Sequence, residues 1–154
     1  MKCALKERRE DSRNREDWIV FDKDNRPNDF DKVISSAQKN QIHIGWSDPC
    51  IEIFFHAYYG KMPNDANPQT CISSFSNDYK EATKKEYLKN EKLIYSFLLK
   101  TGDEENALKI SERTLNVSKE SALKKKPSAY CPGSILHELV GKVVKHRPKK
   151  QGIL

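Results

Sequence analysis

Two aspartates one residue apart, Asp22 and Asp24, are the best candidates for chemistry in this chain of 154 residues. They follow an uninterrupted apolar run, Trp18 to Phe21. In an extended backbone, side chains two residues apart lie on the same side, with Cα atoms roughly 7 Å apart. Carboxylate oxygens suit Mg²⁺ and leave coordination positions open for water and phosphate. The pattern predicts that Asp22 and Asp24 bind Mg²⁺ or Mn²⁺.

The same spacing also has a purely structural explanation. Asp-x-Asp is common after strands, where the carboxylates accept hydrogen bonds from a turn or from the following helix. No apolar residue follows until Phe30, so the pair is not part of an apolar core segment. On the residues alone, both interpretations stay open.

The elements that would position this pair are predicted from periodicity. Residues 17–22 favour a strand buried on both faces, because the apolar run is short, aromatic and β-branched. Residues 29–40 favour a helix, with an apolar stripe that starts at Phe30. Residues 41–46 alternate as a second strand. A strand, a helix and a strand at this spacing predict parallel strands, whose carboxyl ends meet at one edge.

Glu52 is a third candidate for that edge. Asp48-Pro49 predicts a helix with Asp48 as its N-cap and proline at its first position. Glu52 would lie in the first turn, where the helix dipole favours a carboxylate, and this is a sufficient structural reason for it. It would also lie just beyond the second strand, at the same edge as Asp22 and Asp24.

The remainder of the chain favours helices. One is expected to end near Gly102, and Asp103 is expected to cap the next. A basic linker with two prolines, residues 124–132, precedes a last amphipathic helix. The predicted fold class is therefore α/β, a core of parallel strands with flanking helices followed by a mostly helical C-terminal half. The helix that ends near Gly102 is expected to carry Tyr87, Glu91, Ile94 and Leu98 along one face.

Composition excludes several classes of protein. No apolar stretch approaches the roughly 20 residues needed to span a bilayer, and the charged N-terminus is unlike a signal peptide, so we expect a cytoplasmic protein with no membrane partner. The four cysteines contain no Cys-x-x-Cys pair, which argues against a zinc ribbon or a disulfide scaffold. Glycine-rich phosphate loops and a serine nucleophile elbow are also missing from the sequence.

Positive charge is concentrated near the C-terminus. The net charge is +6, and residues 124–154 contain eight lysines or arginines against one glutamate. A basic segment beside a carboxylate-bearing edge is typical of proteins that bind a polyanion. A solvated, solubilising tail explains the last basic residues equally well. The residues in question are Lys145, Arg147, Lys149 and Lys150.

Three blocks of this sequence resemble the RloB-like family, whose fold is related to the Toprim catalytic domain. They are WIVFDKD at 18–24, SDPCIEIF at 47–54 and PGSILHELV at 132–140, in the family's order. A looser likeness covers residues 87–90. The resemblance spans about 17 to 145, and its second block is the most specific.

The resemblance implies a Toprim-like core, phosphodiester hydrolysis with a divalent metal ion, and a role in bacterial defence against phage or foreign DNA. It further implies abortive infection or a restriction locus as the setting, with an ATPase partner. Carried over, Asp22 and Asp24 are metal ligands and Glu52 is a supporting catalytic residue. Lys89 and His137 would face the same cleft or the phosphates of DNA or RNA.

The chain departs from the family at its start. The family begins with an apolar strand that ends in a Cys-Glu-Gly-type block, and this block supplies the glutamate that acts as general acid or base. Residues 1–16 are charged, and Glu7, Glu10 and Glu16 do not follow an apolar run. The chain is therefore expected to correspond to the C-terminal two-thirds of a family member.

Three functional hypotheses follow. The first is a Toprim-like, Mg²⁺-dependent nuclease, or a catalytically impaired remnant of one. The second is a non-catalytic adaptor that binds nucleic acid or an ATPase, and the third is a small helical interaction protein. In each, residues 17–146 are expected to form the domain, with an αβ core over 17–60 and a helical part over 70–146. A charged segment, 1–16, precedes it and a basic tail, 147–154, follows.

Overall fold

The computed structural model describes residues 16–23, 27–123 and 125–147. These residues form a three-stranded mixed sheet with strand order β1-β2-β3. The strands are β1 (Trp18–Asp22), β2 (His43–Asp48) and β3 (Gly133–Ser134). β1 and β2 are parallel, as predicted, while β3 pairs with β2 in the antiparallel direction.

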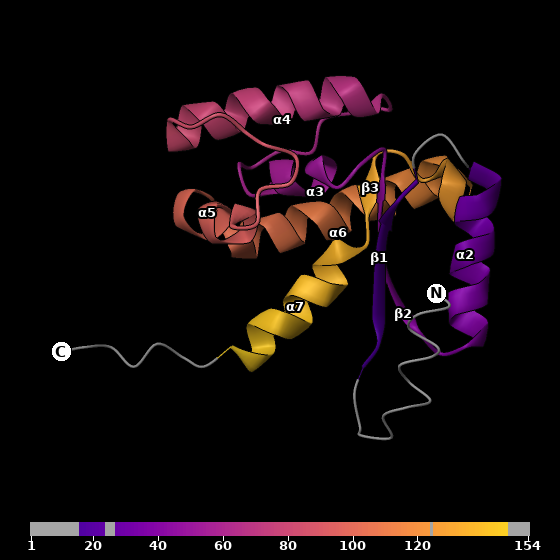
Figure 1. Ribbon diagram of the computed structural model, residues 1–154. Coiled ribbons are helices and arrows are strands. Elements are labelled where there is room, and N and C mark those ends of the chain that lie inside the picture. Colours follow the sequence, from indigo (N-terminus) through magenta and orange to yellow (C-terminus); the bar gives the residue numbers. More distant parts are fainter. Residues whose placement is uncertain (1–15, 24–26, 124, 148–154) are drawn as a thin grey trace.

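Helices lie on both sides of this small sheet. Figure 1 shows α2 on one side of the strands and the other α-helices gathered on the opposite side. The described part of the chain is therefore α/β but mostly helical, in agreement with the predicted class. The helices are α2 (Pro27–Lys39), α3 (Glu52–Ala57), α4 (Pro68–Thr83), α5 (Ile94–Thr101), α6 (Glu104–Ser121) and α7 (Leu136–His146), with a short 3-10 helix, η1 (Pro127–Ala129).

The α2 helix fixes the parallel pair by packing aromatic and aliphatic side chains against it. Phe30 makes edge-to-face contacts with Phe21 of β1 and Trp46 of β2, at ring-centroid distances of 5.5 and 5.4 Å. Ile34, one turn further along α2, is buried in the same cluster. Because one aromatic ring touches both strands, the helix holds them side by side in one register.

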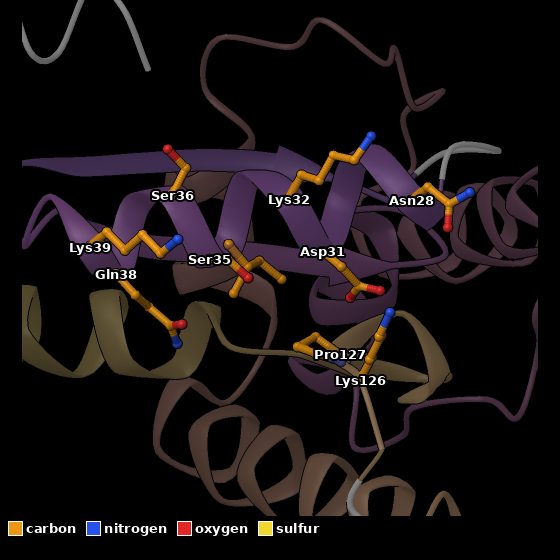
Figure 2. Close-up of a pocket in the computed structure, with 10 residues that line it drawn as sticks. Asn28, Asp31, Lys32, Ser35, Ser36, Gln38, Lys39, Lys126 and Pro127 are labelled. Atoms are coloured by element: carbon orange, nitrogen blue, oxygen red, sulfur yellow. The ribbon is translucent and has the colours of Figure 1, made fainter.

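The outward side of α2 borders a polar groove of about 750 Å³. Lysines line it from both elements that form its walls, Lys32 and Lys39 from α2 and Lys126 from the residue before η1. Figure 2 shows Asp31 and Lys126 pointing toward one another across the gap. The Asp31 carboxylate accepts hydrogen bonds from the backbone amide and hydroxyl of Ser128, at 3.0 and 2.6 Å. The groove is thus bordered mainly by positive charge.

A second core lies among the helices on the other side of the sheet. Phe75 of α4 is fully buried at its centre, and five aromatic or imidazole rings surround it at centroid distances of 4.8 to 6.1 Å. Leu98 of α5 and Ala107 of α6 are buried in the same cluster. The helical half therefore has its own apolar core and packs onto the sheet through α6 and α7.

Gly45 permits the close approach of α7 to the sheet. A Cβ atom at this position would lie 2.8 Å from a methyl carbon of Leu136 and 3.3 Å from one of Val20. Leu136 is the first residue of α7, so a larger side chain at position 45 would force the Leu136 side chain to shift at the contact between α7 and β2.

Three expectations about local structure are wrong. The α3 helix begins at Glu52, and Asp48 is not its N-cap: Asp48 is the last residue of β2, where it pairs with Gly133 of β3, and its carboxylate binds Lys23. Tyr87 and Glu91 belong to the connection before α5, which starts only at Ile94. The sheet is not all parallel, since β3 of the C-terminal half pairs with β2 in the antiparallel direction.

The predicted capping of α6 by Asp103 is confirmed. The Asp103 side chain accepts a hydrogen bond from the backbone amide of Asn106 at 3.0 Å.

Length and polarity exclude membrane-spanning helices within the described residues: none is both long enough and apolar enough to cross a bilayer.

The helical core predicts a large difference between two leucines that are close in sequence. Leu98 is 1% exposed and Leu88 is 64% exposed. Leu98→Ala should lower the free energy of unfolding by about 2–5 kcal/mol, because it leaves a cavity among aromatic rings. Leu88→Ala should change it by about 0.5 kcal/mol or less. Urea denaturation of both variants tests this, and equal effects would contradict the described core.

Candidate active site at the carboxyl edge of the sheet

The carboxyl ends of β1 and β2 meet at one edge of the sheet. Asp22, the last residue of β1, lies opposite Ser47 of β2 in the parallel register. The ladder continues one residue further, since the backbone amide of Lys23 donates to the carbonyl of Ser47 at 3.0 Å. Asp22 is half-buried. The register therefore carries the Asp22 carboxylate to the point where β2 leads into α3.

Glu52 is the first residue of α3 and has no solvent-exposed surface. Its Oε1 accepts a hydrogen bond of 2.9 Å from the phenol of Tyr87. Its Oε2 is buried and has no donor in hydrogen-bond geometry among the residues that the structure describes, although the Cys50 thiol is near enough to interact with the carboxylate. A buried carboxylate oxygen without a donor is costly, so this atom is the most unusual polar group at the edge.

The Tyr87 phenol donates to Glu52 and also feels the charge of Asp22. Burial raises the pKa of its phenol above the usual value, and the charge of Glu52 raises it further. The negative charge of Asp22 acts on the same phenol in the same direction. Tyr87 stays protonated at neutral pH and acts as a hydrogen-bond donor.

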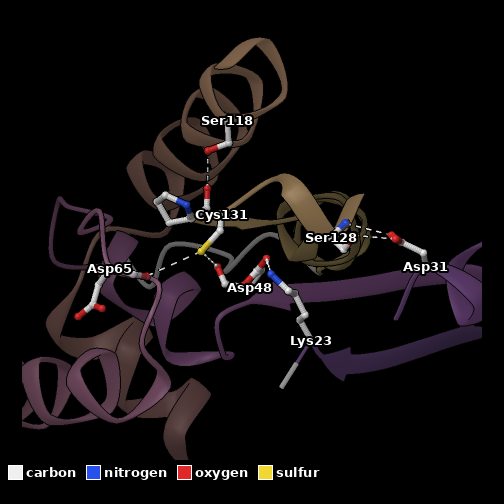
Figure 3. Close-up of polar contacts among 8 residues, drawn as sticks. Lys23, Asp31, Asp48, Asp65, Ser118, Ser128 and Cys131 are labelled. Carbon is white, nitrogen blue, oxygen red and sulfur yellow. Dashed lines mark hydrogen bonds and ion pairs between the residues drawn. The ribbon is translucent and has the colours of Figure 1, made fainter. Parts of the chain in front are cut away.

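An ion pair beside these residues neutralises the remaining carboxylate of the edge. Lys23 Nζ lies 2.7 Å from Oδ2 of Asp48, whose side chain is almost fully buried. Figure 3 shows this pair next to Cys131, whose thiol donates weakly to the carbonyl oxygens of Asp48 and Asp65, at 3.9 and 4.0 Å. Because Asp48 is already paired with Lys23, it is a poor metal ligand. Asp22 and Glu52 are then the carboxylates of this edge that are candidates for binding or catalysis.

The donors at this edge fit a hard divalent cation only in part. Carboxylate oxygens are the correct ligand type for Mg²⁺ and Mn²⁺. Within residues 16–23, 27–123 and 125–147, no group of three or more histidine, cysteine, aspartate or glutamate side chains is arranged to hold a metal ion. Asp24, the second predicted ligand, lies outside the described residues. Asp22 therefore remains a candidate metal ligand, and the position of the second predicted ligand, Asp24, is not described.

His137 has structural partners. Its Nδ1 lies 3.1 Å from the carbonyl oxygen of Ser134 and 3.2 Å from the hydroxyl oxygen of Ser111. Ser111 also donates to the same carbonyl at 3.2 Å. Burial lowers the pKa of the half-buried imidazole, which favours its neutral form. These contacts join the start of α7 to β3 and α6, and no hydrogen bond links His137 to Asp22 or Glu52 in the described chain.

The predicted basic residues have different environments. Lys89 is exposed in the connection between α4 and α5, two residues after Tyr87. Lys145 is exposed in the last turn of α7. Arg147 is engaged: its two terminal nitrogens lie 2.8 and 3.2 Å from the carboxylate of Glu104. Lys149 and Lys150 lie outside the described residues.

Sequence reasoning missed Tyr87 as a member of the site. The sequence pattern places Tyr87 on one face of a helix. In the structure it lies in the connection between α4 and α5 and is hydrogen-bonded to Glu52. The ion pair between Lys23 and Asp48 was also missed. A usable signal existed for Tyr87, since residues 87–90 carry a weak likeness to the same family as the strand-end aspartates.

Together, the fold and the edge define an α/β protein with acidic residues at the carboxyl end of a parallel strand pair. A family model described as RloB-like protein matches residues 2–143, and the chain belongs to this family. The match confirms the resemblance drawn from the three sequence blocks and extends it into the charged segment before residue 17. No curated protein and no solved structure matches the chain.

The contact between Tyr87 and Glu52 predicts a selective effect on stability. Tyr87→Phe removes the phenol that donates to a fully buried carboxylate and should lower the free energy of unfolding by about 1–3 kcal/mol. Tyr59→Phe is the matched control, because the Tyr59 hydroxyl bonds Thr101 at an exposed position. It should cost about 0.5 kcal/mol or less. Equal losses of unfolding free energy in chemical denaturation would show that the buried hydrogen bond stabilises the protein no more than the exposed one.

The environment of His137 predicts a pH dependence. Its folded pKa lies below the ordinary value of about 6.5, so unfolding takes up protons as the pH falls below that value. The contribution of His137 to stability is therefore present above about pH 6.5 and is lost toward pH 5. Denaturation of His137→Asn between pH 7.5 and 5 should show a shallower loss of stability than the unsubstituted protein.

The control for this experiment is His146→Asn, which changes an exposed imidazole at the end of α7. It should keep the steeper pH dependence. If His137→Asn and the unsubstituted protein lose stability in parallel, the imidazole of His137 is not held in its neutral form by burial.

Proposed function

We propose that this chain is a metal-dependent, Toprim-like nuclease that hydrolyses phosphodiester bonds in DNA or RNA, in bacterial defence against phage or foreign DNA. Asp22 and Asp24 are the proposed ligands of Mg²⁺ or Mn²⁺. Glu52 is the proposed general base, and Tyr87 positions it. The defence role rests on family membership alone.

The observation that carries the proposal is the carboxylate of Glu52. Replacing a buried polar group by an apolar one is often neutral or stabilising, so a buried charge with one oxygen lacking a donor is not explained by stability. A general base needs an oxygen that can accept a proton from water. Oε2 has this capacity, while the bond from Tyr87 to Oε1 fixes the orientation of the group.

The residues divide the work as follows. When bound, a divalent ion polarises the phosphate and lowers the pKa of coordinated water. The Asp22 and Asp24 carboxylates would hold that ion, and Glu52 would accept the proton of the attacking water. The Lys23–Asp48 ion pair supports the edge by keeping the buried Asp48 charge compensated.

Cations available for a nucleic-acid backbone lie along α2 and in the connection after Tyr87. Lys32, Lys39 and Lys126 border the groove along α2, and Lys39, in the last turn of this helix, lies far from the carboxyl edge (Figure 2). Lys89 is exposed two residues beyond Tyr87. Lysines attract phosphates irrespective of sequence, so these positions fit backbone contacts better than base recognition.

The proposal predicts metal-dependent cleavage that requires the acidic edge. The purified chain should cleave at least one of single-stranded DNA, duplex DNA, RNA or transfer RNA in Mg²⁺ or Mn²⁺. Asp22→Asn/Asp24→Asn and Glu52→Gln should each reduce the rate by about 100-fold or more, because both remove a charge that acts on the reacting groups. Calorimetry should detect Mn²⁺ binding that the double variant loses.

A matched control is Glu112→Gln, which removes an exposed carboxylate on α6 and should leave the rate within about twofold. Cleavage that is unchanged in the double variant would rule out the proposed site. Binding of nucleic acid without cleavage in either metal would instead favour the non-catalytic adaptor, with an ATPase as its partner.

A further inference from the structure

Two buried cysteines lie together between α3 and α4. Cys50 precedes α3, and Cys71 lies in the first turn of α4. Their side chains are 2% and 0% exposed and share one apolar cluster with Ile53. The thiol of Cys50 also lies 3.9 Å from the carbonyl of Pro68, the first residue of α4. Cys50 is thus in contact with the turn that carries Cys71.

The two thiols are in contact and differ in character. The interaction between the two thiols raises the pKa of Cys50, and burial and Glu52 act in the same direction. The same interaction lowers the pKa of Cys71, and His56 lowers it further, against the opposing effects of burial and Glu52.

The elements around Cys71 support a thiolate. Its position in the first turn of α4 places it near the positive end of the helix dipole, which stabilises negative sulfur. His56 is fully buried, with Nδ1 2.9 Å from Oδ2 of Asp78 and Nε2 3.3 Å from the backbone carbonyl oxygen of Cys71. Lys61 binds the other oxygen of Asp78 at 2.8 Å.

We propose that Cys50 and Cys71 form a redox pair that a peroxide converts into an intramolecular disulfide. The Cys71 thiolate attacks one oxygen of hydrogen peroxide, the O–O bond breaks, and a sulfenic acid forms with release of hydroxide. Cys50 then attacks this sulfur, the S–O bond breaks, and the second hydroxide takes the proton of Cys50. Two thiols and one peroxide become one disulfide and two waters, and a dithiol reductant reverses the reaction.

The expected consequence is a covalent link around the residues between Cys50 and Cys71. This stretch contains the whole of α3, a helix of six residues that carries Glu52 and His56. The bond would join the start of α3 to the start of α4 and restrict their relative opening. This inference does not depend on nuclease activity, because it concerns only the two thiols and the oxidant.

Cys131 provides an internal comparison. It is half-buried, and burial together with Asp48 raises its pKa to about 12. Because the thiolate is the reactive form, Cys131 should react with peroxide more slowly than Cys71 despite its greater exposure. The contrast separates a specific pair from general oxidation of thiols.

The test is oxidation of the full chain with hydrogen peroxide for several hours, followed by digestion and mass spectrometry. The long exposure allows local opening of α3 and α4 to admit the peroxide. The expected product is a peptide linked through Cys50 and Cys71 in a monomeric protein, with a Tm about 5–10 °C higher than the reduced form. Dithiothreitol should restore both the free thiols and the lower Tm.

Two variants sharpen the result. Cys131→Ser should still form the linked peptide, whereas Cys50→Ala should instead accumulate a Cys71 sulfenic acid that dimedone labels. Cys50→Ala shortens a buried side chain only slightly, so its folding is checked by circular dichroism before use. The proposal is overturned if both thiols survive while Cys131 is oxidised, or if the linkage joins Cys131, Cys3 or a second copy of the chain.

Discussion

Parallel pairing of β1 with β2 is the constraint on which the proposed site depends. Two parallel strands end at the same edge only if a crossover returns the chain, and α2 provides this while its Phe30 touches both strands. Asp22 is thereby set opposite Ser47, five residues before Glu52. A slip of one residue would turn Asp22 to the other face of the sheet and separate it from α3. The aromatic packing of α2 against the sheet therefore fixes the position of the proposed site.

The edge also depends on a contact that spans the helical half. Glu52 is fully buried at the start of a six-residue helix, and its hydrogen-bond donor, Tyr87, comes from the connection between α4 and α5. A helix this short has little stability of its own, so α3 persists through its packing against α4 and α6. The aromatic cluster around Phe75, which contacts Tyr87, thus links the second core to the orientation of Glu52.

Local signals were enough to predict much of this fold, and long-range contacts account for the errors. The first strand, α2, the second strand and the Asp103 cap were predicted because apolar periodicity and capping residues act within a few positions. The prediction that Asp48 caps α3 is wrong, and the Asp48 carboxylate instead binds Lys23, which is 25 residues away in sequence. The two-residue strand β3 has no periodicity to detect, and only its pairing with β2 defines it. For the candidate site, the sequence patterns indicate Asp22 and Glu52, whereas Tyr87 has only the weak family likeness at residues 87–90, because its contact with Glu52 joins positions 35 residues apart.

The helix α3 illustrates why function is a better explanation than stability for its polar residues. Glu52 and His56 are one turn apart and both fully buried, and each finds its partner on a later element. The Nδ1 of His56 and the Oδ2 of Asp78 are close but are not aligned as a hydrogen bond, so this pair is also incompletely satisfied. Apolar residues at both positions would avoid these desolvation costs. The proposed general base and the proposed thiol pair therefore lie on and next to one six-residue helix that buries two ionisable groups.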